Sequence, residues 1–217
     1  MGMLWNGCFL AAFVCSLFAS VRLLITFCSR GKILRMQQLS SEVPAIETPR
    51  LLLRRHRLED FPACREMWTD RRVTQFIGGS PLSEEDAWLK FVRNAGYWPL
   101  LGFGFWVLEE KSTGAFAGEI GIAHFFRETQ PPIENLREAA WILVPRMHGK
   151  GYATEAIKAA LGWSDTRFSD PRTICLIHPE NVSSLRVAEK CGFREWSRGT
   201  YHGEPCIIFQ RIQQSPS

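Results

Sequence analysis

Residues 145 to 156 read Pro-Arg-Met-His-Gly-Lys-Gly-Tyr-Ala-Thr-Glu-Ala, and they join an apolar segment to one with helical periodicity. The segment before them, 139–144, is continuously apolar, as in a buried strand, and 152–168 repeats apolar residues at helical spacing. Between them, Gly149 and Gly151 let the backbone come close to a ligand. Unpaired N–H groups at such a helix start favour an anion. The stretch therefore predicts a phosphate-binding loop.

A tight connection whose glycines serve only the turn is the alternative for a lone Gly-x-Gly. Two common phosphate motifs are excluded. The chain has neither the Gly-x-x-x-x-Gly-Lys-Ser/Thr of a Walker loop nor the Gly-x-Gly-x-x-Gly of a dinucleotide site. A phosphate-dependent NTPase is therefore disfavoured.

Blocks at three places resemble the GNAT N-acetyltransferases. Arg146-x-x-Gly149-x-Gly151, followed by Tyr-Ala-Thr-Glu-Ala, resembles the family's acetyl-CoA pyrophosphate loop. About thirty residues later, Asn181-x-x-Ser184 and a helix ending in Lys-Cys-Gly-Phe resemble a second family segment. The opening Glu-Thr-Pro-Arg-Leu-Leu-Leu-Arg, residues 47–54, with Leu-Glu-Asp at 58–60, is similar to the branch of the ribosomal-protein N-terminal alanine acetyltransferases (RimJ/RimL type).

The resemblance implies an α/β protein with the GNAT fold: a mixed, mostly antiparallel central sheet flanked by helices, with a V-shaped splay at the acetyl-CoA site. It divides the chain into an apolar N-terminal segment and linker (1–46), a GNAT N-acetyltransferase domain (47–212) and a flexible tail (213–217). Patterning predicts strands at 50–57, 104–110, 115–126, 138–144, 172–177 and 206–211. It predicts helices at 60–68, 83–94, 152–168 and 184–191.

The net charge of +4 comes from the N-terminal segment, because Arg22, Arg30, Lys32 and Arg35 precede any acidic residue. From Met36 onward, 22 basic residues balance 22 acidic ones, which argues against a nucleic-acid partner. Residues 3–28 are largely apolar and near the length of a membrane span, but Arg22 interrupts them. Three origins stay open: a mis-assigned start upstream of Met36, a membrane anchor, or a targeting peptide.

The seven cysteines are odd in number and lack Cys-x-x-Cys spacing, so we expect neither a disulfide framework nor a metal site. A reducing compartment fits this pattern. We expect a cytoplasmic protein, tethered to the cytoplasmic face of the membrane only if the first 35 residues are real. It is expected to be a monomer or a homodimer.

The resemblance implies acetyl-CoA as co-substrate, without a metal. Its pyrophosphate would bind the loop amides, with Arg146 or Lys150 adding charge, and its pantetheine arm would lie along the strand before the loop. A backbone N–H near Ile142 or Leu143 would polarise the thioester carbonyl, and Asn181 would bind the arm. The residues predicted to contact the coenzyme are Ile142, Leu143, Val144, Arg146, Met147, His148, Gly149, Lys150, Gly151, Tyr152, Ala153, Asn181 and Ser184.

The catalytic candidates are Glu138, Ser184 and Glu119. Many relatives carry a tyrosine general acid where this chain has Ala188, so Ser184 or water must protonate the leaving thiolate, or it departs unassisted. Glu138, at the start of the central strand, and Glu119, on the neighbouring strand, are the candidate bases, with Glu138 slightly preferred. For each, a solvated or ion-paired carboxylate is the simpler interpretation.

The sequence thus predicts an N-acetyltransferase that moves an acetyl group from acetyl-CoA to a primary amine by direct attack. The branch resemblance favours a protein N-terminal amine as acceptor. A small-molecule amine and a non-catalytic acyl-CoA-binding module remain the alternatives.

Overall fold

The structure is a computed structural model, and it describes residues 42–213. Its strands are β1 (Ile46–Glu47), β2 (Leu51–Arg54), β3 (Phe105–Glu110), β4 (Ala115–Ala123), β5 (Thr129–Gln130), β6 (Arg137–Leu143), β7 (Arg172–Ile177), β8 (Arg194–Tyr201) and β9 (Glu204–Ile212). Its helices are α1 (Phe61–Trp68), α2 (Arg71–Thr74), α3 (Glu84–Leu101), α4 (Tyr152–Asp165) and α5 (Val182–Lys190), with short 3-10 turns at Leu58–Asp60 and Pro145–Met147.

In the part of the chain that the structure describes, the strands form one sheet in the order β1-β2-β3-β4-β6-β7-β9-β8-β5. Every neighbouring pair is antiparallel except β6 and β7, which run parallel. This confirms the predicted mixed, mostly antiparallel sheet of the GNAT fold.

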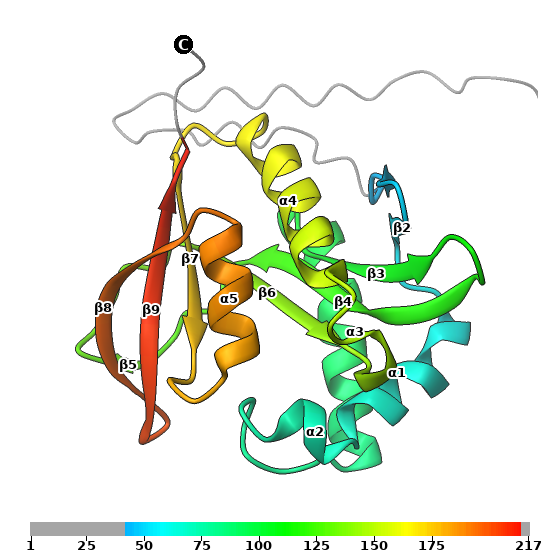
Figure 1. Ribbon diagram of the computed structural model, residues 1–217, viewed down its shortest axis with the longest axis horizontal. Coiled ribbons are helices and arrows are strands. Elements are labelled where there is room, and N and C mark those ends of the chain that lie inside the picture. Colours follow the sequence, from blue (N-terminus) through cyan, green and yellow to red (C-terminus); the bar gives the residue numbers. More distant parts are fainter. Residues whose placement is uncertain (1–41, 214–217) are drawn as a thin grey trace, which may run out of the picture. The chain divides into compact units, whose positions relative to one another are not determined.

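Helices cover both faces of this sheet (Figure 1). Glu119 of β4 is hydrogen-bonded to Trp68 of α1 and Asn94 of α3. Trp141, on the opposite face of neighbouring β6, is hydrogen-bonded to Ser184 of α5. Because successive side chains of a strand point to opposite faces, α1 and α3 cover one face and α4 and α5 the other. We call the first of these the α1–α3 face.

Several predicted elements differ in extent from the observed ones. The helix predicted to end near Asn94 continues as α3 to Leu101, with Pro99 in its last turn. Trp98 explains this, because it is buried and its indole N–H donates to the Phe105 carbonyl (2.7 Å). Strand β8 and the short β1, β5 and α2 were not predicted; β8 alternates exposed and half-exposed residues and therefore lacks an apolar pattern.

Asp60 precedes the first helix, as expected, but its side chain makes no helix-capping hydrogen bond there. Its carboxylate instead binds the Arg54 guanidinium through two contacts (2.8 and 2.7 Å). No helix within residues 42–213 is long and apolar enough to cross a membrane. The predicted apolar segment and most of the flexible tail lie outside the described residues, so the domain boundaries remain a prediction.

Candidate functional site

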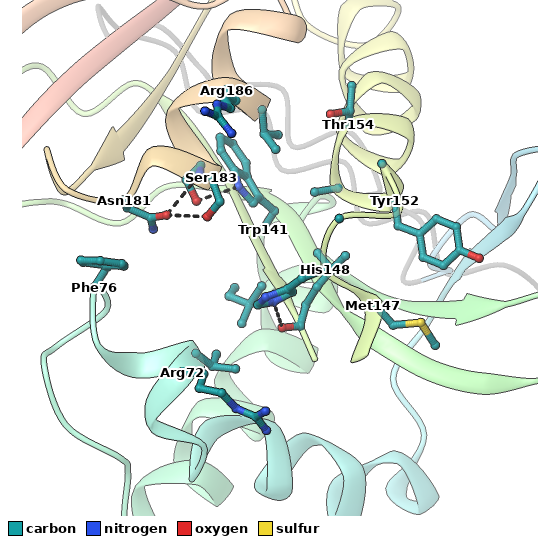
Figure 2. A pocket seen from close by; sticks show the side chains of 18 of the residues that line it. Arg72, Phe76, Trp141, Met147, His148, Tyr152, Thr154, Asn181, Ser183 and Arg186 are labelled. Carbon is teal, nitrogen blue, oxygen red and sulfur yellow. Dashed lines mark hydrogen bonds between the residues drawn. The ribbon is translucent and has the colours of Figure 1, made fainter. Parts of the chain in front are cut away.

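A cleft opens where β6 and β7 separate. The two strands pair only at Arg137↔Thr173 and Glu138↔Ile174, although both continue for several residues. Beyond that point β7 stays paired with β9, while β6 stays paired with β4. This is the predicted V-shaped splay, and we call the space the β6–β7 cleft. Its volume is about 430 Å³ and its walls come from α2 and the loop after it, β6, the phosphate-binding loop, α4 and α5 (Figure 2).

The edge of β6 offers unpaired backbone groups to this cleft. The Val144 N–H donates to the Ala117 carbonyl on β4 (3.0 Å). Since backbone groups of an antiparallel ladder alternate in direction, the Ile142 N–H also faces β4, whereas the Leu143 N–H faces the cleft. Gly118 permits this close pairing, because a Cβ there would collide with the Ile142 carbonyl. Leu143 is therefore the better placed of the two predicted carbonyl-polarising donors.

The phosphate-binding loop (145–153) has the backbone that its sequence predicts. Gly149 and Gly151 adopt positive φ angles of 75° and 80°, a conformation that favours glycine. Gly151 is the N-cap of α4, so the first N–H groups of that helix have no partner within the helix. The backbone of Gly149, Gly151 and Ala153 lies along the cleft. Tyr152 also lines it, but its phenol turns away and donates to Glu110 (2.6 Å; Figure 2).

The cationic side chains of the cleft differ from those expected. The Arg146 guanidinium donates to the Phe116 carbonyl (2.8 Å), and the Lys150 ammonium lies between Met147 and Glu110, so neither side chain lines the cleft. Val144 does not line it either. Positive charge in the cleft comes instead from Arg72, Arg186 and Lys190. In the sequence, the spacing of Arg186 and Lys190, which lie one turn apart on α5, could have indicated this positive charge.

Arg50 ties the phosphate-binding loop to the sheet. Its guanidinium donates to the Lys150 carbonyl (2.8 Å) and to Glu155 of α4 (2.7 Å), and it stacks over the Tyr152 ring at 4.5 Å. The backbone N–H of Arg50 also donates to Glu155 (3.0 Å). The conformation of the loop is therefore held by a residue from the opening block of the sequence.

Asn181 and Ser184 line the cleft together with β6, and Figure 2 shows the side chain of Asn181 there. Asn181 caps α5, because its Oδ1 accepts from the Ser184 N–H (3.1 Å) and the Ser183 hydroxyl (2.9 Å). Its amide nitrogen has no partner among the described residues and is left to donate into the cleft. The Ser184 hydroxyl accepts from the Trp141 indole (3.3 Å). Asn181 thus caps α5 and also faces the cleft. Ala188, one turn after Ser184 on the same helix, is fully buried.

Glu119 is a fully buried carboxylate on the α1–α3 face. It accepts from His56 Nε2 (2.7 Å), Trp68 Nε1 (3.0 Å) and Asn94 Nδ2 (3.3 Å). Burial, the largest single effect, favours the neutral acid, but these hydrogen bonds outweigh it and hold the pKa of Glu119 below its ordinary value. Because an ionised carboxylate only accepts, His56 carries its hydrogen on Nε2. His56 was not anticipated from the sequence.

Glu138 is also buried on the α1–α3 face, where β6 and β7 begin to separate. Arg127, from the segment between β4 and β6, donates to both carboxylate oxygens of Glu138 (2.9 and 2.6 Å). Burial raises the pKa of Glu138, against the opposing effect of Arg127. The guanidinium of Arg127 also lies over the rings of Phe125 and Tyr201. Glu138 is thus ion-paired, the simpler of the two interpretations from sequence.

His148 lies on the phosphate-binding loop and is exposed overall, yet its ring turns back toward the strand. Nε2 donates to the Leu143 carbonyl (2.9 Å), and the ring lines the cleft (Figure 2). Met147 is buried beside it. Within residues 42–213, no three His, Cys, Asp or Glu side chains gather as a metal site requires.

Comparison with known proteins agrees with this geometry. The family model for the acetyltransferase (GNAT) domain matches residues 50–194, which contain the whole cleft. The chain belongs to the GNAT acetyltransferase family. This GNAT protein is 31% identical over 154 residues to the uncharacterized N-acetyltransferase YnaD of Bacillus subtilis (strain 168), a match that covers 69% of this chain and 82% of the relative.

Solved structures share the GNAT fold. The crystal structure of an acetyltransferase from Agrobacterium tumefaciens str. C58 is 28% identical, with a TM-score of 0.69 over 79% of this chain and 96% of that chain. The RimL ribosomal L7/L12 α-N-protein acetyltransferase, solved in complex with coenzyme A, has a TM-score of 0.63 at 16% identity, over 78% of this chain and 98% of that chain. These structures show the fold, and it is membership of the GNAT acetyltransferase family that makes the protein an acetyl-CoA-dependent acyltransferase.

Proposed function

We propose that this GNAT protein binds acetyl-CoA in the β6–β7 cleft and transfers the acetyl group to a primary amine by direct attack. The observation that carries the proposal is the meeting of an unpaired strand edge with an uncapped helix start. Strand edges pair with extended amide chains, which suits the pantetheine arm, and helix starts bind phosphate, which suits the pyrophosphate. Arg186 and Lys190 supply the positive charge for the remaining phosphate oxygens.

In the reaction, the amine nitrogen bonds to the thioester carbon, and the carbon–sulfur bond breaks with its electrons staying on sulfur. The Leu143 N–H stabilises the negative charge that develops on the carbonyl oxygen, a contribution of about 2.7–4 kcal/mol for one such donor. The amine loses a proton, and the CoA thiolate gains one. Ser184 is placed to donate to the sulfur, but a thiol pKa near 8.5 makes unassisted departure feasible.

Glu119 is better placed than Glu138 to act on the amine. Glu119 lies directly opposite Ile142, beside the proposed thioester site, whereas Glu138 is four residues further along β6, about 13 Å away. Since the pKa of Glu119 is low, it stays ionised and stabilises the positive charge forming on the attacking nitrogen. The proton then passes to water. Glu138 instead anchors Arg127 and the segment that carries it.

An α-amine fits this weakly basic site best. An α-amine with a pKa near 7.8 is roughly one-third neutral at physiological pH, whereas a lysine side chain near 10.4 is about one part in a thousand neutral. With no strong base to remove the proton, the already neutral amine reacts. A protein N-terminus is therefore the proposed acceptor class, with small-molecule amines as the alternative.

The test incubates the full chain with acetyl-CoA and a panel of amines, measuring both released CoA thiol and acetylated product by mass spectrometry. The panel contains peptides with free N-termini, the same peptides with blocked N-termini and a free lysine, and a polyamine. We expect product from free N-termini in preference to blocked ones. Binding of acetyl-CoA without turnover on any amine would support a non-catalytic acyl-CoA-binding module and refute the proposal.

A further inference from the structure

The turn between β2 and α1 carries His56 into the interior of the α1–α3 face. Its side chain is only 3% exposed, although the neighbouring Arg55 and Arg57 are both exposed. The ring also meets Phe91 of α3 edge to face, with 5.4 Å between the centroids. Because a buried polar side chain needs a hydrogen-bond partner, the contact that His56 makes inside deserves an explanation.

Asp60 fixes the turn on which His56 stands. The Asp60 carboxylate accepts from the backbone N–H of Arg57 (2.8 Å), and the Arg57 carbonyl accepts from the backbone N–H of Asp60 (2.9 Å). The same carboxylate binds the guanidinium of Arg54, which in turn donates to the Arg55 carbonyl (3.1 Å). Arg54 and Asp60 are both buried. The backbone is therefore held on both sides of His56, and this sets the direction of its side chain.

Of the three donors to Glu119, His56 is the closest. Its Nε2 lies 2.7 Å from the carboxylate, compared with 3.0 Å for Trp68 and 3.3 Å for Asn94. The amide of Asn94 is a poor substitute, since its own buried Oδ1 has no partner among the described residues. A fully buried carboxylate keeps its charge only while donors replace the water that it has lost. Loss of the shortest bond should therefore shift Glu119 toward its neutral form.

We propose that His56 is a positioning residue for acetyl transfer, whose Nε2–H holds the Glu119 carboxylate charged and fixed opposite Ile142. The inference rests on the proposed function, in which the charge of Glu119 stabilises the positive charge that forms on the attacking amine. His56 does not line the β6–β7 cleft, so it acts through Glu119 rather than on the coenzyme. A fixed, desolvated charge stabilises a transition state more than a mobile, hydrated one does.

The test compares two variants of similar size that differ in one hydrogen-bond donor. His56→Gln keeps an N–H that can reach Glu119, whereas His56→Leu fills the same space without a donor. Each is made alone and together with Glu119→Gln. For every variant of the full chain, kcat and KM are measured with a peptide that has a free N-terminus, the Kd for acetyl-CoA by calorimetry, and folding by thermal unfolding.

We expect His56→Leu to lower kcat by about tenfold or more, the usual strength of a hydrogen bond to a charged group. The Kd for acetyl-CoA should stay within a few-fold, and His56→Gln should recover most of kcat. Adding His56→Leu to Glu119→Gln should cost nothing further, because two residues that act as a unit are not additive. Equal kcat for His56→Leu and His56→Gln, or additive losses in the double variant, would overturn the inference while leaving acetyl transfer standing.

The pH profile of kcat separates positioning from a loss of folding. The pKa of Glu119 lies below its ordinary value in the wild type, so its charge persists into the acidic range. In His56→Leu the carboxyl group should ionise at higher pH, so kcat should rise with pH through a limb that the wild type and His56→Gln lack. The other titratable groups that face Glu119 are Cys64, whose raised pKa keeps its thiol neutral, and Lys90, with a pKa of about 8. Profiles repeated in Lys90→Met identify the part due to Lys90.

An NMR titration makes the test independent of turnover. The side-chain carboxyl signal of Glu119, in protein with ¹³C-labelled glutamate, is assigned by its loss in Glu119→Gln and followed with pH in the wild type, His56→Leu and His56→Gln. We expect a higher pKa in His56→Leu alone. That result without acetylation of any amine would support the hold of His56 on Glu119 and refute the proposed function. The same titration in the wild type and His56→Leu would contradict the inference whether or not an amine is acetylated.

Discussion

Glu119 and Ile142 lie directly opposite each other across β4 and β6, at the point where β6 has lost its other neighbour. One side of β6 is thus fixed to a strand whose carboxylate is held by three donors, and the other side is open to a ligand. This arrangement holds the negative charge of Glu119 near the free backbone N–H of Leu143. It suits a reaction in which positive charge forms on nitrogen while negative charge forms on oxygen.

Replacing Glu119 by Gln tests its electrostatic role. The variant keeps the shape of the side chain but removes the charge, and we expect kcat to fall by roughly a hundredfold, the size typical of such a group. Binding of acetyl-CoA, measured by calorimetry, should stay within a few-fold because Glu119 does not line the cleft. A kcat within threefold of wild type would remove Glu119 from the mechanism.

The ion pair of Glu138 and Arg127 should act on stability more than on chemistry. Glu138→Gln leaves a largely buried guanidinium without its partner, which costs about 3 kcal/mol in the free energy of unfolding. The double variant Glu138→Gln with Arg127→Met removes both charges and should recover much of that loss. Urea denaturation of both single variants and the double variant measures the coupling; additive losses would contradict the structural assignment.

Arg50 should affect coenzyme binding without touching the coenzyme. Arg50→Ala frees the Lys150 carbonyl and Glu155, so the phosphate-binding loop loses its tie to the sheet. We expect the Kd for acetyl-CoA to rise by roughly fivefold, equivalent to about 1 kcal/mol. Arg65→Ala is the matched control, since it breaks an exposed ion pair with Glu84 away from the cleft. Equal Kd values for the two variants would show that the tie is unimportant.

We predict that the stability difference between the wild type and Lys90→Met depends on pH. Its pKa is about 8 in the folded state and near 10.5 when unfolded, because burial and Arg93 disfavour the charge, with Arg127 adding to this and Glu119 opposing it. The charged lysine therefore destabilises the fold fully below pH 8, and the penalty disappears as pH rises toward 10.5. Lys90→Met should be more stable than wild type at pH 7, with the gain shrinking by pH 10 in thermal unfolding. A constant difference would contradict the lowered pKa of Lys90.

Local patterns predicted the parts of the site that depend on the backbone. The phosphate-binding loop follows from Gly149 and Gly151 between an apolar strand and a periodic helix, and β7 spans the predicted 172–177. The family resemblance correctly placed the splay and the fold. Asn181 and Ser184 lie in the cleft as expected, although the same residues also cap α5.

Side-chain partners between distant segments could not be read from spacing. His56 meets Glu119 across 63 residues, and Arg127 meets Glu138 from a segment with no pattern. Arg146 and Lys150 stand in the phosphate-binding loop, but its turns direct them toward Phe116 and Glu110 rather than into the cleft. Strand β8 was not predicted, because pairing within the sheet rather than an apolar face determines its conformation.

The central claim is that acetyl-CoA occupies the β6–β7 cleft, and calorimetric titration of the full chain with acetyl-CoA tests it most directly. The decisive pair is Gly149→Asp and Gly114→Asp, which replace glycines with φ angles of 75° and 69° and no neighbour within 4 Å. Both variants carry the same backbone strain, but only Gly149→Asp places a carboxylate where the pyrophosphate should bind. We predict that Gly149→Asp loses acetyl-CoA binding by tenfold or more, about 1.4 kcal/mol, while Gly114→Asp binds as the wild type does. Equal binding by the two variants, or no binding by the folded wild type, would contradict the assignment of the cleft.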